Sequence, residues 1–102
     1  MYAVVRKSVY DRTKLAQGAP RLAEFDALHR NQPGFLGSIS IDAGDGATVL
    51  VNLWESEAHA VAGLQILGPH VERLIEPLFA KPSELLGAGP AVARDLAPNR
   101  TK

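Results

Sequence analysis

Two neighbouring segments with alternating side chains constrain the fold of this chain most strongly. Residues 35–42 and 47–54 each alternate, and the sequence Asp-Ala-Gly-Asp-Gly, residues 42–46, connects them. A period of two predicts β-strands, and a short connection with two glycines predicts that the strands form a hairpin. An antiparallel strand pair is therefore expected in the middle of the sequence.

The length of the connecting loop sets the register of this hairpin. A three-residue loop, 44–46, with Gly46 in the left-handed conformation, pairs Ile41 with Val49 and Ile39 with Val51. A loop of two or four residues would place apolar side chains beside polar ones. We expect the wholly apolar face of the hairpin to lie under helices: Phe35, Ile39, Ile41, Val49, Val51 and Leu53. The reverse face is mixed: Leu36, Ser38, Ser40, Leu50, Asn52 and Trp54.

The segments before the hairpin predict one strand and one helix. Residues 2–10 are rich in β-branched and aromatic side chains, which favours a strand. Asp11 and Thr13 are candidate helix caps, and the regular helix is expected from about Pro20, whose fixed φ suits a first turn. Leu22, Phe25, Leu28 and His29 form one helical stripe, and Pro33-Gly34 ends the segment.

The segments after the hairpin predict a broken helix and a last strand. Ser56 is a candidate N-cap, and Gly68-Pro69 is expected to stop the helix that it begins. An amphipathic stripe continues over residues 71–79, which Pro77 must kink or end. The last strand is predicted over residues 88–96, where Pro90 is tolerated near a strand start or at a sheet edge.

The order β-α-β-β-α-β predicts a ferredoxin-like α+β fold with a four-stranded antiparallel sheet. We expect residues 1–97 to form one domain and residues 98–102 to be a frayed tail. Helices on one face leave the other face bare. Exposed apolar area on that face favours a homodimer joined sheet to sheet through Leu36, Leu50 and Trp54.

Composition excludes several classes of function. The chain has 102 residues, 11 basic and 11 acidic side chains and no cysteine. Such a balanced charge predicts no nucleic-acid partner, and the absence of cysteine excludes disulfides and thiolate chemistry. No apolar stretch approaches the length of a membrane span and no leader pattern follows Met1, so we expect no membrane association and a cytoplasmic location. No phosphate-binding loop or G-x-S-x-G motif supports nucleotide binding or hydrolysis.

Four motifs carry a resemblance to a known family. They are Met-Tyr-Ala-Val-Val-Arg at residues 1–6, Gln-Pro-Gly-Phe-Leu-Gly at 32–37, the 42–46 turn, and Leu-Trp-Glu-Ser-Glu-Ala at 53–58. Together they resemble the antibiotic biosynthesis monooxygenase domain of the dimeric α/β-barrel superfamily. The resemblance implies a barrel of two facing sheets, with a pocket between each sheet and its helices. Some members of the family oxidise aromatic polyketides there without a cofactor, and others cleave haem.

Five side chains are candidates for catalysis. The resemblance implies that cofactor-free oxygenases stabilise a substrate anion with Asn, Trp, Tyr and Arg side chains, and Asn52, Trp54, Tyr10 and Arg6 supply these types here. His70 lies near the start of a helical segment, where the helix dipole would hold it neutral and able to act as a base or axial ligand. The competing interpretation assigns Asn52 and Trp54 to the dimer interface.

Other polar residues leave alternatives open. Arg6 and Lys7 are adjacent, so alternation places one of them on each face of the sheet. A cation on a covered face is expected either to pair with a carboxylate or to bind an anion. The candidate carboxylates are Glu24, Asp26, Glu72 and Glu76. His29, His59 and His70 form no i, i+4 pair, so we predict no metal site and no resident cofactor.

These observations lead to one leading function and two alternatives. The leading hypothesis is a cofactor-independent monooxygenase-like protein that binds a small apolar or aromatic molecule between sheet and helices. The first alternative is a non-catalytic protein that binds a hydrophobic ligand or only assembles, because the predicted lining is nearly all aliphatic. Haem binding or haem degradation is a minor alternative, because the first strand lacks the Asn that haem-degrading relatives carry.

Overall fold

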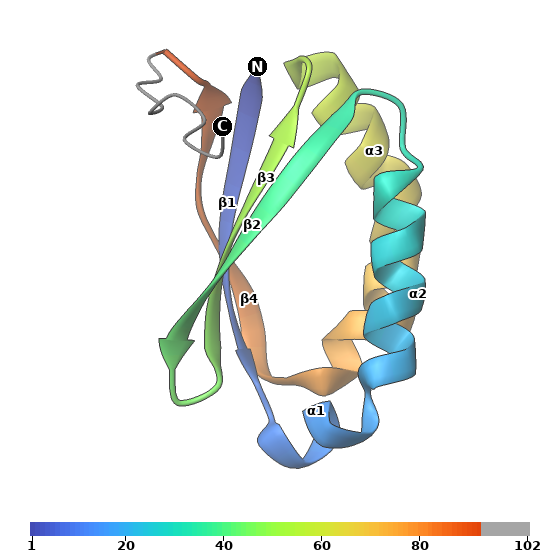
Figure 1. Ribbon diagram of the computed structural model, residues 1–102, viewed down its shortest axis with the longest axis vertical. Coiled ribbons are helices and arrows are strands. Elements are labelled where there is room, and N and C mark those ends of the chain that lie inside the picture. Colours follow the sequence, from blue (N-terminus) through green and yellow to red (C-terminus); the bar gives the residue numbers. More distant parts are fainter. Residues whose placement is uncertain (93–102) are drawn as a thin grey trace, which may run out of the picture.

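The protein has one four-stranded sheet with helices on one side (Figure 1). This computed structural model describes residues 1–92. The sheet order is β2-β3-β1-β4, and every neighbouring pair is antiparallel. The strands are β1 (Tyr2–Tyr10), β2 (Phe35–Gly44), β3 (Ala47–Trp54) and β4 (Phe79–Pro90), and the α-helices are α1 (Arg12–Gln17), α2 (Ala19–Arg30) and α3 (Glu57–His70). This arrangement confirms the predicted ferredoxin-like fold.

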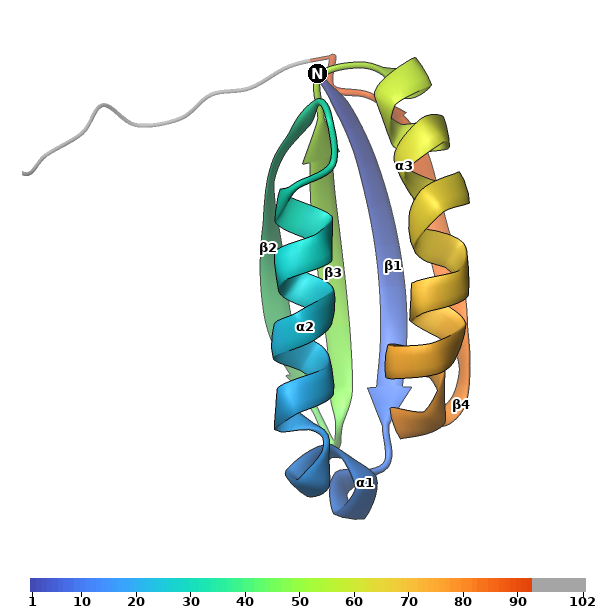
Figure 2. The same ribbon diagram turned by 90° about the vertical axis from the view of Figure 1, so that its right-hand side faces the viewer.

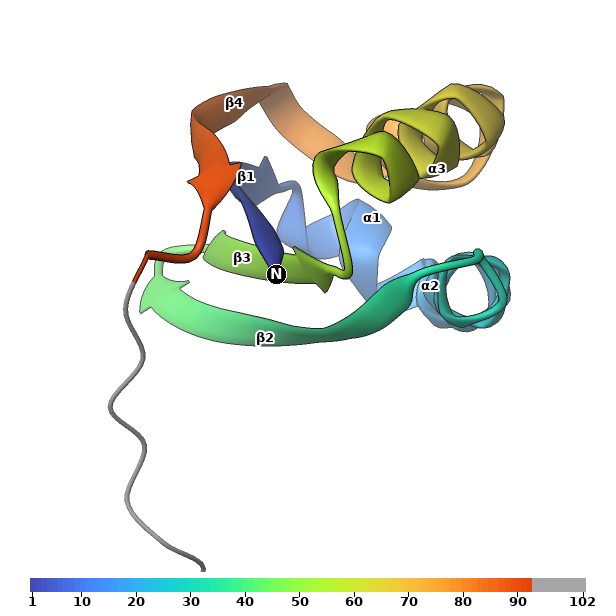
Figure 3. The same cartoon turned by 90° about the horizontal axis from the view of Figure 1, so that it is seen from above.

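The two long helices form the second layer. Helix α2 lies over β2 and β3, whereas α3 lies over β1 and β4 (Figure 2). Viewed from above, both helices lie on the same side of the curved sheet (Figure 3). The predicted first helix is two helices: the carboxylate of Asp11 accepts hydrogen bonds from the N–H groups of Thr13 and Lys14 to cap α1, and Pro20 lies in the first turn of α2.

The predicted register of the hairpin is confirmed, but the turn that produces it differs. Ile41 pairs with Val49 and Ile39 with Val51. The turn has positive φ at both of its central residues, 54° at Asp45 and 82° at Gly46, as in a two-residue type I′ turn. This turn is one residue shorter than the predicted loop, and a bulge between Asp42 and Gly44 takes up the extra residue, so the register is the same. The Asp42 carboxylate stabilises this bulge by accepting a 2.9 Å hydrogen bond from the N–H of Gly44.

The prediction of which sheet face meets the helices was wrong. Trp54 is 1% exposed and Asn52 is 8% exposed, whereas Ile39 is 56% exposed and Ile41 49% exposed. The mixed face of the hairpin therefore lies under the helices, and the aliphatic face is bare. Phe35 crosses to the helix side because a bulge between Phe35 and Gly37 shifts the phase of β2, so that Phe35 pairs with Trp54.

The shape of Trp54 explains the choice of face. Its indole ring packs against Gly63 of α3 so closely that a Cβ atom on residue 63 would overlap the Cη2 atom of the ring. Val4, Ala60 and Leu67 complete this buried cluster. A glycine and an alanine on one helical face let α3 approach the largest side chain of the sheet closely, and the flat aliphatic face offers no such match.

The predicted break of the second helix at Gly68-Pro69 was also wrong. Helix α3 passes through both residues and ends at His70. A π-helical turn, η1 (Val71–Ile75), and a 3₁₀ turn, η2 (Glu76–Leu78), follow directly. Pro69 lacks the N–H that would complete the preceding turn, and the irregular hydrogen bonding begins two residues later, at Val71, rather than at Gly68-Pro69.

The last strand begins earlier than predicted. Strand β4 starts at Phe79 and ends at Pro90, instead of covering residues 88–96. Pro82 falls in an irregular stretch of the ladder, between the pairs Val9 with Lys81 and Lys7 with Glu84. An edge strand with a bulge needs no N–H from such a proline, which is why a strand is possible here. Residues 93–96 of the predicted strand, the domain end at 97 and the tail 98–102 lie outside the described residues.

Candidate functional site

The helix-facing side of β1 and β3 carries four of the five predicted site residues. Val4 pairs with Asn52 and Arg6 with Leu50, and both partners of the first pair are buried. Because side chains alternate along a strand, Arg6 and Tyr10 share this inner face with Asn52 and Trp54. Lys7 belongs to the outer face, beside Val49 and Glu84.

The predicted dimer contacts are placed differently. Leu50 and Trp54 belong to the inner face, so they cannot join two bare sheets. Leu36, at the β2 bulge, is 50% exposed. The error followed from the face assignment, because a one-residue change of phase moves a whole set of side chains to the other side.

Asn52 is the most unusual polar residue on the inner face. Its side chain is 8% exposed, and its Oδ1 atom has no hydrogen-bond partner within residues 1–92. A buried amide oxygen without a partner costs about 1–3 kcal/mol of folding free energy. The neighbouring Trp54 is instead a packing residue, enclosed by Gly63, Phe35 and the buried cluster.

Arg6 is held by one serine hydroxyl rather than by an acid. Its Nε atom donates a 3.1 Å hydrogen bond to the Oγ atom of Ser83 on β4, and Ser8 donates to the same oxygen at 3.3 Å. Within the described part of the chain, none of the four predicted carboxylates forms a salt bridge with Arg6, and Glu24 bonds Arg73 instead. The half-buried guanidinium therefore keeps its terminal nitrogens for another partner.

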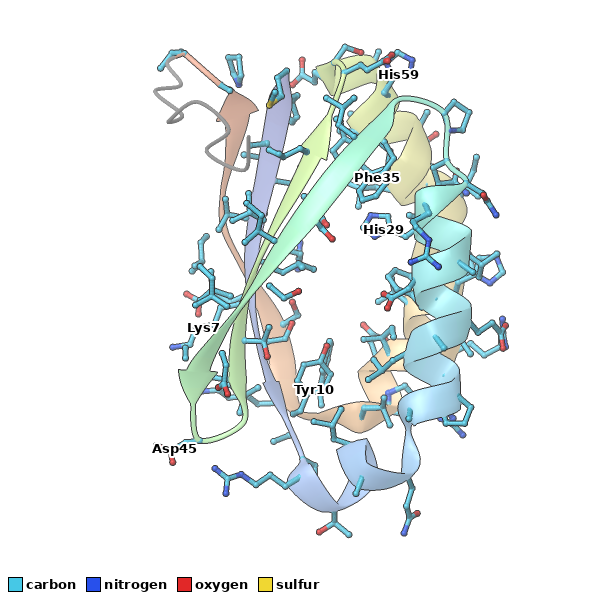
Figure 4. The ribbon with its side chains drawn as sticks, in the orientation of Figure 1. Lys7, Tyr10, His29, Phe35, Asp45 and His59 are labelled. Atoms are coloured by element: carbon cyan, nitrogen blue, oxygen red, sulfur yellow. The ribbon has the colours of Figure 1, made fainter. Side chains whose placement is uncertain are left out.

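Tyr10 lies at the opposite end of β1 from the Trp54 cluster and points into the space between sheet and α2 (Figure 4). Its ring packs edge to face against Phe79, with centroids 5.3 Å apart. Burial, and secondarily the negative charge of Asp26, raises the pKa of the Tyr10 hydroxyl. The phenol therefore stays protonated at neutral pH and can donate a hydrogen bond but not accept a proton.

His70, the fifth predicted residue, does not share this face. Its Nδ1 atom lies 3.2 Å from a terminal nitrogen of Arg73 in an exposed contact. The same guanidinium donates a 3.0 Å hydrogen bond to Glu24 of α2. His70 thus belongs to a surface network that links α2 to η1, so it is placed neither as a base nor as an axial ligand for a molecule under the helices.

His29, which was not predicted as a site residue, faces the sheet from the last turn of α2 (Figure 4). It is 8% exposed, and its ring lies 4.3 Å from Phe35, 5.5 Å from Phe25 and 5.8 Å from Trp54 between centroids. Burial lowers the pKa of His29, and the charge of Asp26 partly opposes that change. The helical stripe that contains Phe25 and His29 was the sequence signal for this position.

Two surface pockets lie at the two ends of the sheet. The pocket at the hairpin end has a volume of about 570 Å³ and is lined by Tyr10, Arg12, Leu15 and Thr48 together with the turn. The other, about 390 Å³, is lined by Tyr2, Ser56 and Glu57 among others. Tyr10 is the only predicted site residue that lines either of these two pockets.

Neither a metal cluster nor a membrane-spanning helix is present in the described residues. No three His, Asp or Glu side chains within residues 1–92 gather closely enough to hold a metal ion. No helix in the same part of the chain is long and apolar enough to cross a membrane.

Comparisons with known proteins identify the fold. No protein-family model matches the chain, and no curated protein matches it. A protein of unknown function from Nitrosomonas europaea superposes with a TM-score of 0.73 and 16% identity, covering 96% of this chain and 95% of that chain. A crystal structure of an antibiotic biosynthesis monooxygenase superposes with a TM-score of 0.73 and 15% identity, covering 91% of this chain and 100% of the other.

Two further structures belong to proteins with a named activity or ligand. A variant of SnoaB, a cofactor-independent oxygenase from Streptomyces nogalater, has a TM-score of 0.72 and 22% identity over 96% of this chain and 97% of that one. A variant of MhuD with two manganese protoporphyrin IX molecules bound per active site has a TM-score of 0.70 and 19% identity over 95% and 100%. The chain therefore has the fold of the antibiotic biosynthesis monooxygenases.

Proposed function

We propose that this protein binds a small, flat, apolar or aromatic molecule between its sheet and helices and oxidises it with dioxygen, without a cofactor. The observation that carries the proposal is the buried, unpartnered Oδ1 atom of Asn52 on the inner sheet face. A polar group that destabilises the folded chain is best explained by a partner that the chain itself does not supply. A ligand hydroxyl would be such a partner. The fold shared with SnoaB supports oxygenation as the chemistry.

The inner face offers complementary groups for such a ligand. Asn52 would accept a hydrogen bond from a phenol or enol. Arg6 is a diagonal neighbour of Asn52 across the β1–β3 ladder, about 7–8 Å away, and would stabilise the negative charge that develops when the ligand loses a proton. Phe35 is partly exposed and packs edge to face on the buried Trp54, so its ring offers an aromatic surface that suits a planar ligand. In this proposal the ligand supplies all the electrons that reduce dioxygen.

The proposal can be tested with anthrone, a flat tricyclic ketone with an acidic methylene group. Anthrone and dioxygen yield anthraquinone and water. One oxygen atom becomes the carbonyl oxygen on the former methylene carbon, and the other leaves as water. We expect the protein to bind anthrone, as shown by quenching of Trp54 fluorescence, and to accelerate formation of anthraquinone. Asn52→Leu should lower the rate about tenfold or more while the chain unfolds at the same or a higher temperature.

The control for this test is Asn31→Leu, because Asn31 is an exposed asparagine at the end of α2. It should leave binding and rate unchanged. Wild-type protein that does not accelerate the oxidation would contradict the proposed activity. Binding without oxidation would instead support the non-catalytic alternative, although the aliphatic lining that first favoured that alternative lies on the outer face.

Haem binding is less well supported. The neighbour MhuD binds manganese protoporphyrin. In this chain, however, His70, the residue named above as a possible axial ligand, contacts Arg73 on the surface. This position does not fit an axial ligand under the helices, so titration with haemin should leave its Soret band unchanged.

We also propose that the bare sheet face pairs with that of a second copy. Two neighbouring cross-strand rows lie on this face: one is wholly apolar, Ile39, Val51 and Val5 with Gly87, and the other adds the charged pair Lys7 and Glu84 to Ile41 and Val49. Ile39 and Ile41 are about half exposed in the single chain. A contiguous apolar face of this kind is self-complementary about a two-fold axis, and a second copy is always present at the same concentration.

The dimer proposal predicts twice the chain mass in sedimentation at micromolar concentration. Ile39→Asp should give a folded monomer, because it introduces a charge into the face without touching the buried cluster. Ser40→Asp is the matched control: it adds the same charge to the next residue of β2, on the other face, and should leave the dimer intact. A wild-type monomer would contradict this proposal.

A further inference from the structure

We propose that His29 is the proton acceptor of this site, the residue that removes the acidic proton of the bound aromatic molecule. This inference rests on the proposed function, which names no base. The ordinary candidates on the inner face cannot fill that role, because Asn52 and Arg6 have no basic atom available and the Tyr10 hydroxyl is protonated. His70 lies in the exposed contact with Arg73.

The position of His29 suits a base that faces a planar ligand. The side chain extends from the end of α2 toward the sheet (Figure 4). It borders Phe35, the ring proposed to face the planar ligand, and the buried Trp54. Asn52 is two residues from Trp54 on the same inner face, and His29 packs near the ring of Trp54, so both residues are neighbours of Trp54.

The ring of His29 forms no hydrogen bond within residues 1–92. In the same range, the side-chain nitrogen and oxygen atoms that are completely buried and lack a hydrogen-bond partner belong to Gln32 and Asn52, and no nitrogen of His29 is among them. The nitrogens of His29 therefore keep some contact with the space outside the protein atoms, although the residue is only 8% exposed. A merely structural role at this position, between three aromatic rings, would be served better by an apolar side chain.

The surrounding charges favour proton transfer to His29. Burial keeps the imidazole neutral and lowers its pKa, so a free electron pair is present at neutral pH. Asp26, one turn earlier on α2, acts in the opposite direction and stabilises the imidazolium that forms. The groups that meet the ring from β2 and β3 are Phe35 and Trp54, which carry no charge.

The chemical step is a simple proton transfer. With anthrone, a methylene C–H bond breaks, an N–H bond forms on His29, and the electron pair stays in the ligand anion, delocalised over its rings. Dioxygen then accepts electrons from this anion. One oxygen atom remains in the product ketone, and the other leaves as water with the proton from His29 and the second methylene proton.

The first experiment is an NMR titration of the wild-type protein with anthrone in the absence of oxygen. The chain has three histidines, so their ring signals can be assigned with single His→Gln variants. We expect the His29 ring signals to shift on binding, with those of His59 and His70 unchanged. His59 is a built-in control, because its Nδ1 atom already pairs with the Ser56 hydroxyl at 2.7 Å.

The second experiment compares two variants in air. His29→Gln keeps hydrogen-bonding atoms but removes the base, and should reduce the rate of anthraquinone formation at least 100-fold. It should also abolish the fall in rate at acidic pH, with anthrone binding retained. His70→Gln should keep the rate within twofold of the wild type. If His29→Gln does not fold, the wild-type titration still decides the question.

The outcomes separate this inference from the proposed function. Anthrone that binds without shifting the His29 signals would overturn the role of His29, and wild-type oxidation would still support the oxygenase proposal. A fully active His29→Gln variant would have the same meaning. A wild-type protein that neither binds nor oxidises anthrone would overturn both.

Discussion

The two faces of the sheet differ in a way that hydrophobicity alone does not anticipate. The outer face is more aliphatic, yet Ile39 and Ile41 are about half exposed. The inner face carries serines, an asparagine and an arginine, yet it is the one that meets the helices. A helix layer therefore selects shape complementarity, here a tryptophan against a glycine, and not the larger apolar content.

The difference also separates two kinds of contact. On the inner face, one end is packed around Trp54, and the other carries Arg6, Ser8 and Tyr10, which are half-buried. On the outer face, aliphatic side chains run across the strands, and within the described residues no buried polar atom that lacks a partner lies among them. The polar groups that our proposed ligand would meet are thus on the inner face, and the flat apolar surface that our proposed dimer would use is on the outer face.

The largest effect is expected from filling the close approach between helix and sheet. Gly63→Leu would force a Cβ atom into the indole ring of Trp54 and should lower the free energy of unfolding by about 3 kcal/mol or more. Gly68→Ala in the same helix meets nothing within 4 Å and should raise it by up to about 1 kcal/mol. Urea unfolding measures both. Equal effects would contradict a tight α3–β3 contact.

Adjacent residues of β3 test the two faces directly. Trp54→Ala should cost about 3–5 kcal/mol at any protein concentration, because the cavity forms within one chain. Leu53→Ala changes the outer face, so its cost should depend on protein concentration if the face joins two copies. Thermal unfolding at two widely separated concentrations measures the difference. A concentration-dependent loss for Trp54→Ala would reverse our assignment of the faces.

A smaller effect is expected at the polar end of the inner face. Ser83→Ala removes the oxygen that accepts from Arg6 at 3.1 Å and from Ser8 at 3.3 Å, and should cost about 1 kcal/mol. Ser40→Ala on the other edge strand alters an exposed hydroxyl and should change stability by less than about 0.5 kcal/mol. Chemical denaturation resolves the two. Equal losses would show that Ser83 does not anchor Arg6.

The effect of His29 on the free energy of unfolding should be smallest at neutral pH and grow on acidification. Its pKa is lowered in the folded protein, so below the ordinary histidine pKa the unfolded chain binds a proton that the folded chain does not. Stability should therefore fall as pH decreases from the unfolded to the folded pKa, and not change further below it. Urea midpoints between pH 8 and 5 measure this fall. His29→Phe should abolish it, whereas His70→Gln should retain it.

Most of the framework could be predicted because it depends on local patterns. The alternation of residues 35–54 specified both strands and their register, and Ser56 specified the start of α3 through the hydrogen bond that its hydroxyl accepts from the N–H of His59. Pro69 misled the prediction of the second helix, because it lies within α3 and a π turn follows it. The start of the last strand was also misplaced, because β4 begins at Phe79 and includes Pro82 in an irregular part of its ladder.

The candidate site was only partly predictable. Arg6, Tyr10, Asn52 and Trp54 could be named by chemical type, but the assumed face placed two of them in a dimer interface. His29 was visible as part of a helical stripe, yet only the packed structure surrounds it with Phe25, Phe35 and Trp54. A periodic pattern identifies a face of an element without identifying what that face meets.

The amino-acid sequence alone determined the order of the elements, the antiparallel hairpin and its register, because these depend on side chains that are neighbours along the strands and turns. Only the tertiary structure decided which side of the sheet the helices cover, and with it the surroundings of Asn52 and His29. The physical reason is that this choice depends on how Trp54 fits against Gly63, a contact between two distant elements whose shapes must match in space.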